Sequence, residues 1–337
     1  MDEDPLAAFG GVDAPFDEPP VRSAPRPRRR ERSRDGVGGD RIDRDDRSSA
    51  GVGSGDRNLP VAVAVGVGLV ALGLICFKLG TLPTAILATV VVTLAGMEYF
   101  NAVRTAGYNP ATLLGMAAVC GFVLSTALFG LAAYPLLIGI TVVAVLVWYL
   151  LVAPGDGSVP NLAMTLLGVF WIGGLGSFAG LFLGLGDVVA DRGGLDTNPG
   201  IGVLLAAVIA SVSYDVGGYF VGRRFGHTRL SAASPNKTQE GFAGGIAVSV
   251  VVTTVAVSFV SPIGDDNLFR TFVFALLCAL AAPIGDLCES FVKRDLGVKD
   301  MGTVLPGHGG VLDRFDSLLF VLPVAYFVTI PLGVWTV

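Results

Sequence analysis

The side chains best suited to chemistry are gathered near the C-terminal end of a chain that is otherwise strongly apolar. Five of them recur at helical spacing and would form one stripe on a helix: Asp286, Glu289, Ser290, Lys293 and Arg294. Carboxylate oxygens suit a hard cation such as Mg²⁺, and Lys and Arg side chains suit phosphate oxygens. The stretch therefore predicts a metal-assisted site for phosphoryl or nucleotidyl transfer.

A second pair of carboxylates follows a glycine-rich loop. Asp313 and Asp316 would share a face near the N-terminus of a helix that begins there. The loop Pro306–Gly310 either closes a tight turn or lets the backbone approach a phosphate, because glycine has no Cβ. We expect Asp286, Asp313 and Asp316 to bind one metal ion between two helix ends.

Three further polar groups stand in or beside apolar segments. Asp215 lies where an exposed charge would cost roughly 3 kcal/mol, so we expect it to face a polar cavity. Lys237 and Thr238 precede an apolar segment, where a cation and a helix N-terminus together favour an anion. Glu98, near the end of another apolar segment, is interpreted as a carboxylate that is structural or that supports the residues of the site from behind.

The elements that must position these groups are apolar segments of membrane-spanning length. The chain has 337 residues, of which 52% are hydrophobic and 15% charged, and its mean hydropathy is +0.68. This predicts an all-α polytopic integral membrane protein of about nine transmembrane helices. The expected segments are 60–77, 80–100, 111–131, 134–153, 161–186, 199–221, 242–261, 269–288 and 316–336.

The N-terminal part differs sharply in composition. Residues 1–57 are rich in Asp, Arg, Pro, Gly and Ser, which predicts a disordered cytosolic tail. Residues 58–337 are then a multi-helix transmembrane catalytic domain, with its polar signature at 290–317. Basic residues gather in the loops after the sixth and eighth segments, so the positive-inside rule predicts that these loops, and with them the active site, face the cytosol. We expect the membrane to be the plasma membrane.

The polar stretch resembles the signature of the phosphatidate cytidylyltransferase (CDP-diacylglycerol synthase) family. The matching positions are Ser290, Lys293, Arg294, Lys299, Asp300, Gly302, Leu305, Pro306, His308, Gly309, Gly310, Asp313, Arg314 and Asp316. A looser similarity lies at Ser234–Gly241, where the family commonly has S-P-K-K-T-x-E-G and this chain has Asn236 at the first lysine. That departure puts a contact from position 236 in doubt and leaves Lys237 and Thr238 in place.

The resemblance implies that CTP and phosphatidate react to give CDP-diacylglycerol and pyrophosphate for phospholipid synthesis. The implied catalytic residues are Asp286, Lys293, Arg294, Asp313, Asp316 and His308, with Asp286, Asp313 and Asp316 as ligands of Mg²⁺. The implied substrate-binding residues are Ser290, Lys237, Thr238, Lys299, Arg314 and Asp215. The expected partners are CTP, phosphatidate and the lipid bilayer, without nucleic acid; a second metal ion and a homodimer stay open.

Other functions would use similar residues. A CTP-dependent lipid kinase of the polyprenol type, or a cytidylyltransferase for another lipid phosphate, needs the same metal and phosphate groups. A secondary transporter also carries acids within its membrane segments, but the dense polar stretch and the lack of an obvious repeated half disfavour it.

Overall fold

The computed structural model describes residues 59–155, 157–195, 198–230, 237–259, 263, 267–305 and 309–335, with side chains from residue 64 onward. These residues belong to one compact unit, Gly55–Val337. The tail predicted at 1–57, together with Asn236 and His308, lies outside the described residues.

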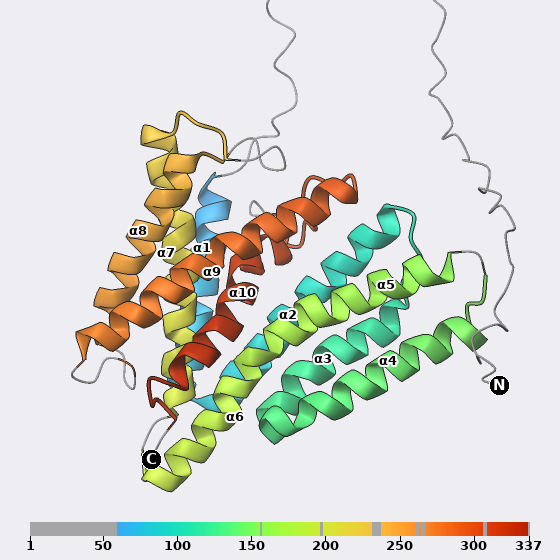
Figure 1. The fold of residues 1–337 in the computed structure, drawn as a ribbon, viewed down its shortest axis with the longest axis horizontal. Helices are drawn as coiled ribbons and strands as arrows, with labels where there is room; N and C mark the ends of the chain where they lie inside the picture. The colour runs from blue at the N-terminus through green and yellow to red at the C-terminus, as the bar shows by residue number, and fades with distance from the viewer. Residues whose placement is uncertain are drawn as a thin grey trace, which may run out of the picture. The chain divides into compact units, whose positions relative to one another are not determined.

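The described residues are helical, and the only β-type pairings among them are two isolated bridges between loop residues. The helices are α1 (Leu59–Leu79), α2 (Thr81–Thr105), α3 (Thr112–Phe129), the 3₁₀ turn η1 (Gly130–Ala132), α4 (Ala133–Leu151), α5 (Ser158–Gly168), the π-helical turn η2 (Val169–Gly174), α6 (Leu175–Gly193), α7 (Pro199–Phe225), α8 (Gln239–Val257), α9 (Leu268–Asp295) and α10 (Leu312–Thr329). Figure 1 shows their arrangement.

The nine predicted apolar segments all fall on these helices, which confirms the all-helical fold class. The segment predicted at 161–186 runs from α5 through η2 into α6 without a loop. Two boundaries differ in a way that matters for the site: α9 continues to Asp295, and α10 begins at Leu312. Lys293 and Arg294, which follow segment eight, are therefore on α9, and Asp313, which precedes segment nine, is on α10.

The apolar helices make this chain a multi-pass membrane protein. In the described part, six helical stretches are long and apolar enough to cross a bilayer by length and composition. They are Thr81–Thr105, Thr112–Leu151, Ser158–Gly193, Pro199–Phe225, Gln239–Val257 and Leu268–Asp295. The count of nine crossings stays a prediction.

Glycines bring α7 and α8 close together. A Cβ added at Gly241 on α8 would lie 3.0 Å from the Gly218 carbonyl oxygen and from Gly222 Cα on α7. A Cβ at Gly245 would lie 2.9 Å from the Tyr214 carbonyl oxygen. Small residues at such a crossing let helix backbones approach within the membrane. The start of α8 is thereby held against the C-terminal half of α7.

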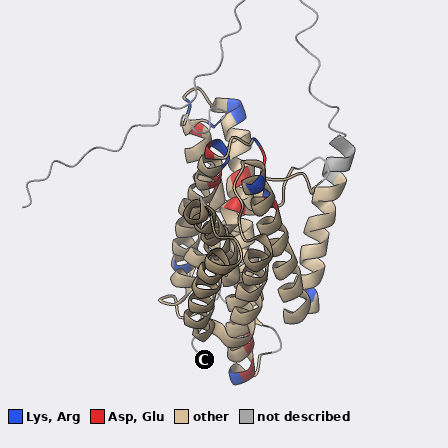
Figure 2. Ribbon diagram, turned by 90° about the vertical axis from the view of Figure 1, so that its right-hand side faces the viewer, with Lys and Arg blue, Asp and Glu red and all other residues tan. Residues whose placement is uncertain are grey.

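A second close crossing joins α9 to α10. A Cβ at Gly285 would lie only 2.4 Å from the carbonyl oxygen of Asp316, so no larger residue fits there without moving a backbone. This contact places Asp286, the next residue on α9, beside the first turns of α10. Figure 2 shows most of the Lys, Arg, Asp and Glu of the described helices gathered toward one end.

Candidate active site

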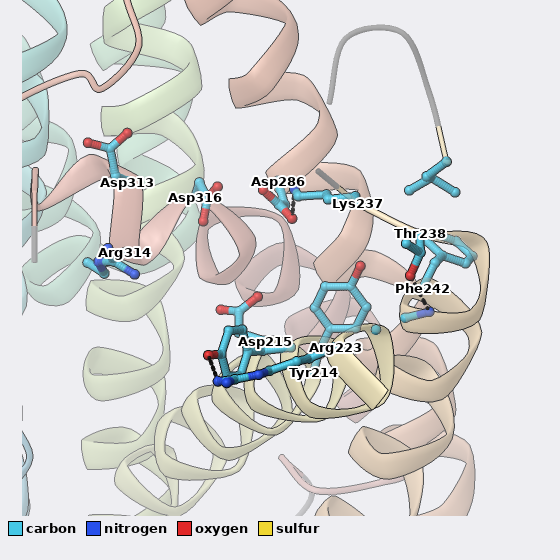
Figure 3. A pocket seen from close by; sticks show the side chains of 15 residues that line it. Tyr214, Asp215, Arg223, Lys237, Thr238, Phe242, Asp286, Asp313, Arg314 and Asp316 are labelled. Atoms are coloured by element: carbon cyan, nitrogen blue, oxygen red, sulfur yellow. Dashed lines mark hydrogen bonds and ion pairs between the residues drawn. The ribbon is translucent and has the colours of Figure 1, made fainter. Parts of the chain in front are cut away.

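A cavity of about 450 Å³ opens between α7, the start of α8, α9 and α10 (Figure 3). Its lining residues are Tyr214, Asp215, Gly218, Tyr219, Gly222, Arg223, Leu230, Lys237, Thr238, Gly241, Phe242, Asp286, Asp313, Arg314 and Asp316. Seven of these were predicted from the sequence as site residues. The structure thus brings together positions that are about a hundred residues apart in the chain.

Three carboxylates from three helices converge on this cavity. Asp215 comes from α7, Asp286 from α9 and Asp316 from α10, and Figure 3 shows all three directed toward a common space. The Asp316 Oδ1 accepts a hydrogen bond from the Ser317 amide at 2.7 Å. The Ser317 hydroxyl donates to Asp215 Oδ1 at 3.4 Å, which links α10 to α7. Asp215 therefore faces a polar cavity, as predicted.

Lys237 faces the carboxylates from the other side and forms an ion pair with Asp286. Its backbone is held by a short pairing of the loop, in which the Leu230 amide donates to the Lys237 carbonyl at 2.8 Å. The next residue, Thr238, caps α8 by accepting a hydrogen bond from the Gly241 amide at 3.1 Å. The cap aims the N-terminus of α8 and the Lys237 ammonium at the same region, a combination that favours anions.

Lys293 belongs to a separate, buried cluster. Its ammonium donates to Glu289 Oε2 at 2.5 Å and to Asp313 Oδ1 at 2.9 Å. Asp313 also accepts hydrogen bonds from the backbone amides of Met301 and Gly310, each at 3.1 Å to Oδ2. Although Asp313 lines the cavity, its carboxylate is thus engaged with Lys293 and with the loop between α9 and α10.

The same loop is also held by Glu98 of α2, which is only 2% exposed. Glu98 Oε2 accepts a hydrogen bond from the Leu312 amide, at the start of α10, at 2.8 Å. A Cβ at Gly302 would lie 2.3 Å from Glu98 Cδ, and one at Gly310 would lie 2.6 Å from Glu98 Oε2. These two signature glycines are therefore required by close packing on a buried acid.

Gly309 instead serves a turn. Its φ of +87° favours glycine, and its amide and carbonyl pair with those of Leu305. Of the two interpretations of the glycine-rich loop, the described part supports the tight turn. Pro306, Gly307 and His308 lie outside the described residues, so the predicted role of His308 stays a prediction.

Four predicted residues do not line the cavity: Ser290, Lys293, Arg294 and Lys299. Arg294 and Lys299 are exposed, and Ser290 is partly buried on α9. In the other direction, the cavity includes Arg223 and Tyr219, which sequence reasoning did not assign to the site. Tyr219 and Arg223 lie four and eight positions after Asp215, so helical spacing puts them on the same face as Asp215 and could have assigned them to the site.

The donors at the cavity fit Mg²⁺ by their chemistry, because the three converging side chains offer carboxylate oxygens. Among the described residues, however, no three acidic, His or Cys side chains stand at metal-binding spacing. Asp286 is engaged by Lys237, and Asp313 by Lys293. The metal set Asp286, Asp313 and Asp316 therefore stays a prediction.

A helical membrane fold with carboxylates and cations around one polar cavity defines a class: integral membrane enzymes that act on phosphates. The model of the cytidylyltransferase family matches residues 60–330. Because that match covers most of the chain, the protein belongs to the cytidylyltransferase family.

Individual relatives agree with this assignment. The chain is 33% identical over 257 residues to a phosphatidate cytidylyltransferase of Synechocystis. The aligned region covers 70% of this chain and 85% of that protein. It is 43% identical over 129 residues to the protein of the same name from Bacillus subtilis, covering 38% of this chain and 47% of that one. With the Mycobacterium leprae protein of that name the identity is 46% over 124 residues, or 36% and 38% of the two chains. The chain thus matches about half of the length of the Bacillus relative and most of the Synechocystis one.

Proposed function

We propose that this protein transfers the cytidylyl group of CTP to phosphatidate, giving CDP-diacylglycerol and pyrophosphate. The observation that carries the proposal is the single cavity in which Asp215, Asp286 and Asp316 meet Lys237 and Arg314. Membership of the cytidylyltransferase family supports the choice of nucleotide, and the names of the relatives support the choice of lipid.

In the proposed reaction a phosphate oxygen of phosphatidate attacks the α-phosphorus of CTP. One P–O bond forms, the bond from the α-phosphorus to the oxygen that bridges to the β-phosphate breaks, and pyrophosphate leaves with that oxygen. A phosphate monoester is already largely ionised near neutral pH, so the attack needs no strong general base. The protein must instead oppose the negative charge of the two substrates and of the leaving group.

The cations of the cavity meet that need. Lys237 stands at the N-terminus of α8, and Arg314 lies in the first turn of α10. We assign both to phosphate oxygens. Lys237 forms an ion pair with Asp286, and a bound phosphate would compete for its ammonium group.

We further propose that Mg²⁺ is held by Asp286 and Asp316, with Asp215 beside them. Asp313 is a poorer ligand, because its oxygens accept from Lys293 and two amides. A bound Mg²⁺ supplies charge neutralisation for the phosphates. Asp313 would then act on the site through the loop that it holds, and Lys293 by keeping Asp313 in place.

The proposed location is the plasma membrane, with the cavity facing the cytosol where CTP is available. In support, Arg223 and Arg224 end α7, and Lys293 and Arg294 end α9, on the same side as the cavity. An excess of basic residues marks the cytosolic ends of membrane helices. A homodimer stays part of the proposal.

The test is to incubate purified protein with phosphatidate and with CTP labelled at either the α- or the γ-phosphate. We expect lipid-phase label from the α-phosphate alone, in a product identified as CDP-diacylglycerol by mass spectrometry. Lipid label from the γ-phosphate would instead show a CTP-dependent lipid kinase and would overturn the proposal.

A further inference from the structure

One face of α7 carries an apolar stripe that ends in a cation. Val216, Tyr219, Phe220 and Arg223 follow one another at helical spacing, so their side chains share a face. The three apolar or aromatic residues are 49%, 58% and 64% exposed, and Arg223 is also exposed. In a helix that crosses a membrane, such exposed apolar side chains are in contact with lipid.

The end of this stripe is also the rim of the cavity. Tyr219 and Arg223 line the cavity, whereas Val216 and Phe220 do not. The guanidinium of Arg223 donates to the Tyr219 hydroxyl at 2.9 Å, and its carbon lies 6.0 Å from the centre of the Tyr219 ring. The polar cavity and the lipid-facing surface of α7 therefore meet at Tyr219 and Arg223.

Arg223 is available to an anion. Within the described part of the chain, no carboxylate forms an ion pair with Arg223. A guanidinium has five N–H groups in a planar fork, and the bond to Tyr219 uses one of them. Tyr219 orients the group, and the remaining N–H groups can bind two oxygens of one phosphate.

We propose that Arg223, oriented by Tyr219, binds the phosphomonoester headgroup of the lipid substrate while its acyl chains lie along Val216 and Phe220. The inference rests on the proposed function and names the place where the lipid enters. A lipid with an anionic headgroup is suited to a cation at the border between a polar cavity and an apolar face. CTP has no apolar chain that could pack on the stripe. Lys237 and Arg314 remain for the nucleotide phosphates.

The experiment compares Arg223→Gln with Arg224→Gln. Arg224 is a matched control, because it is exposed on the same helical turn but lies outside the cavity lining, with its guanidinium carbon 5.4 Å from the Phe225 ring. Initial rates are measured against the surface fraction of phosphatidate in detergent mixed micelles at saturating CTP, and then against CTP at saturating phosphatidate. For Arg223→Gln we expect at least a tenfold rise in KM for phosphatidate and no change in KM for CTP. Arg224→Gln should resemble the unaltered protein in both.

Two graded variants sharpen the comparison. Arg223→Lys keeps the charge but loses the planar fork, so its KM for phosphatidate should lie between those of the unaltered protein and Arg223→Gln. Tyr219→Phe keeps the ring and removes the hydroxyl, so we expect a several-fold rise in the same KM.

Two results would overturn the inference. A rise in KM for CTP instead of phosphatidate would assign Arg223 to the nucleotide, and equal behaviour of the Arg223 and Arg224 variants would make Arg223 a membrane-interface anchor. Binding of phosphatidate without CTP, measured by native mass spectrometry, should weaken for Arg223→Gln and stay unchanged for Arg224→Gln. That readout separates the inference from the proposed function, whose own failure would appear as an unaltered protein that makes no cytidylyl lipid.

Discussion

At the residue scale, the aspartates of the site differ in what surrounds them. Asp286 faces the cavity and forms an ion pair with the Lys237 ammonium. Asp313 accepts from Lys293 and from two backbone amides, and its side chain is 8% exposed. The same chemical change at the two positions should therefore have different consequences.

Asp286→Asn removes a charge from the cavity with little change in shape. We expect at least a hundredfold fall in turnover, on the order of 3 kcal/mol of transition-state stabilisation, with thermal stability almost unchanged. Turnover and thermal unfolding are measured on the same preparation, with Asp191→Asn at an exposed position of α6 as the control. A well-folded Asp286→Asn with a normal rate and an unchanged Mg²⁺ requirement would rule out a metal or phosphate role.

Asp313→Asn should lower both turnover and stability. After the change, Glu289 is the one carboxylate of the described residues still paired with the Lys293 ammonium. The change also weakens two hydrogen bonds from backbone amides of the α9–α10 loop. Loss of one partner in a buried ion pair costs on the order of 3 kcal/mol. We expect a clear drop in melting temperature together with at least a hundredfold loss of rate. Loss of rate alone, at full thermal stability, would instead favour a direct metal-ligand role.

At the element scale, contacts between helices distant in sequence set the site. The α9–α10 crossing at Gly285 aligns Asp286 with Asp316, and the glycines of α7 and α8 hold the start of α8 against the helix that carries Asp215. Glu98 adds a third link, because it ties α2 to the first amide of α10. The carboxylates of the cavity are thus placed by three helix contacts.

Glu98→Gln tests the third of these links. An amide oxygen can still accept from the Leu312 amide, but the change removes the charge and replaces one carboxylate oxygen with an NH₂ donor in a closely packed place beside Gly302 and Gly310. We expect a loss of about 1 to 2 kcal/mol in stability, seen by thermal unfolding, and a smaller change in turnover. If turnover fell a hundredfold without a loss of stability, Glu98 would have to act in the chemistry and not through the helix contact.

At the scale of the whole molecule, the distribution of charge defines an orientation. The basic C-terminal ends of α7 and α9 stand with the cavity at one end of the helices, and the C-terminal end of α6, which carries Asp187 and Asp191, lies toward the other end (Figure 1). The proposed function needs the cavity on the side where CTP is present. A cavity that faced the other side of the membrane would therefore contradict the proposed function.

Single cysteines in an otherwise cysteine-free protein test that orientation. Thr228 lies in the loop after α7 and Thr303 in the loop after α9, and both are exposed. Cysteines at these positions should react with an impermeant maleimide only from the cytosolic side, and one at Asp191 only from the outside. The reverse pattern of labelling would put the cavity on the wrong face for CTP.

Much of this molecule was determined by local sequence. A membrane helix makes its hydrogen bonds within itself, so the length and hydropathy of each apolar segment predict it without knowledge of its neighbours. The signature from Ser290 to Asp316 likewise pointed to phosphate chemistry and to the family, and the family assignment is confirmed. Asp215 was predicted to face a polar cavity because a charge inside an apolar segment is costly.

The tertiary structure alone decided which of the polar residues share one space. It turned Asp313 toward Lys293, left Ser290 and Arg294 outside the cavity lining, and brought Arg223 into it. It also placed Glu98, far away in the chain, against Gly302 and Gly310. Helical spacing says which residues share a face of one helix, but the side chains at each crossing decide which face meets which neighbour. That choice depends on packing between distant segments, so it could not be predicted from any one of them.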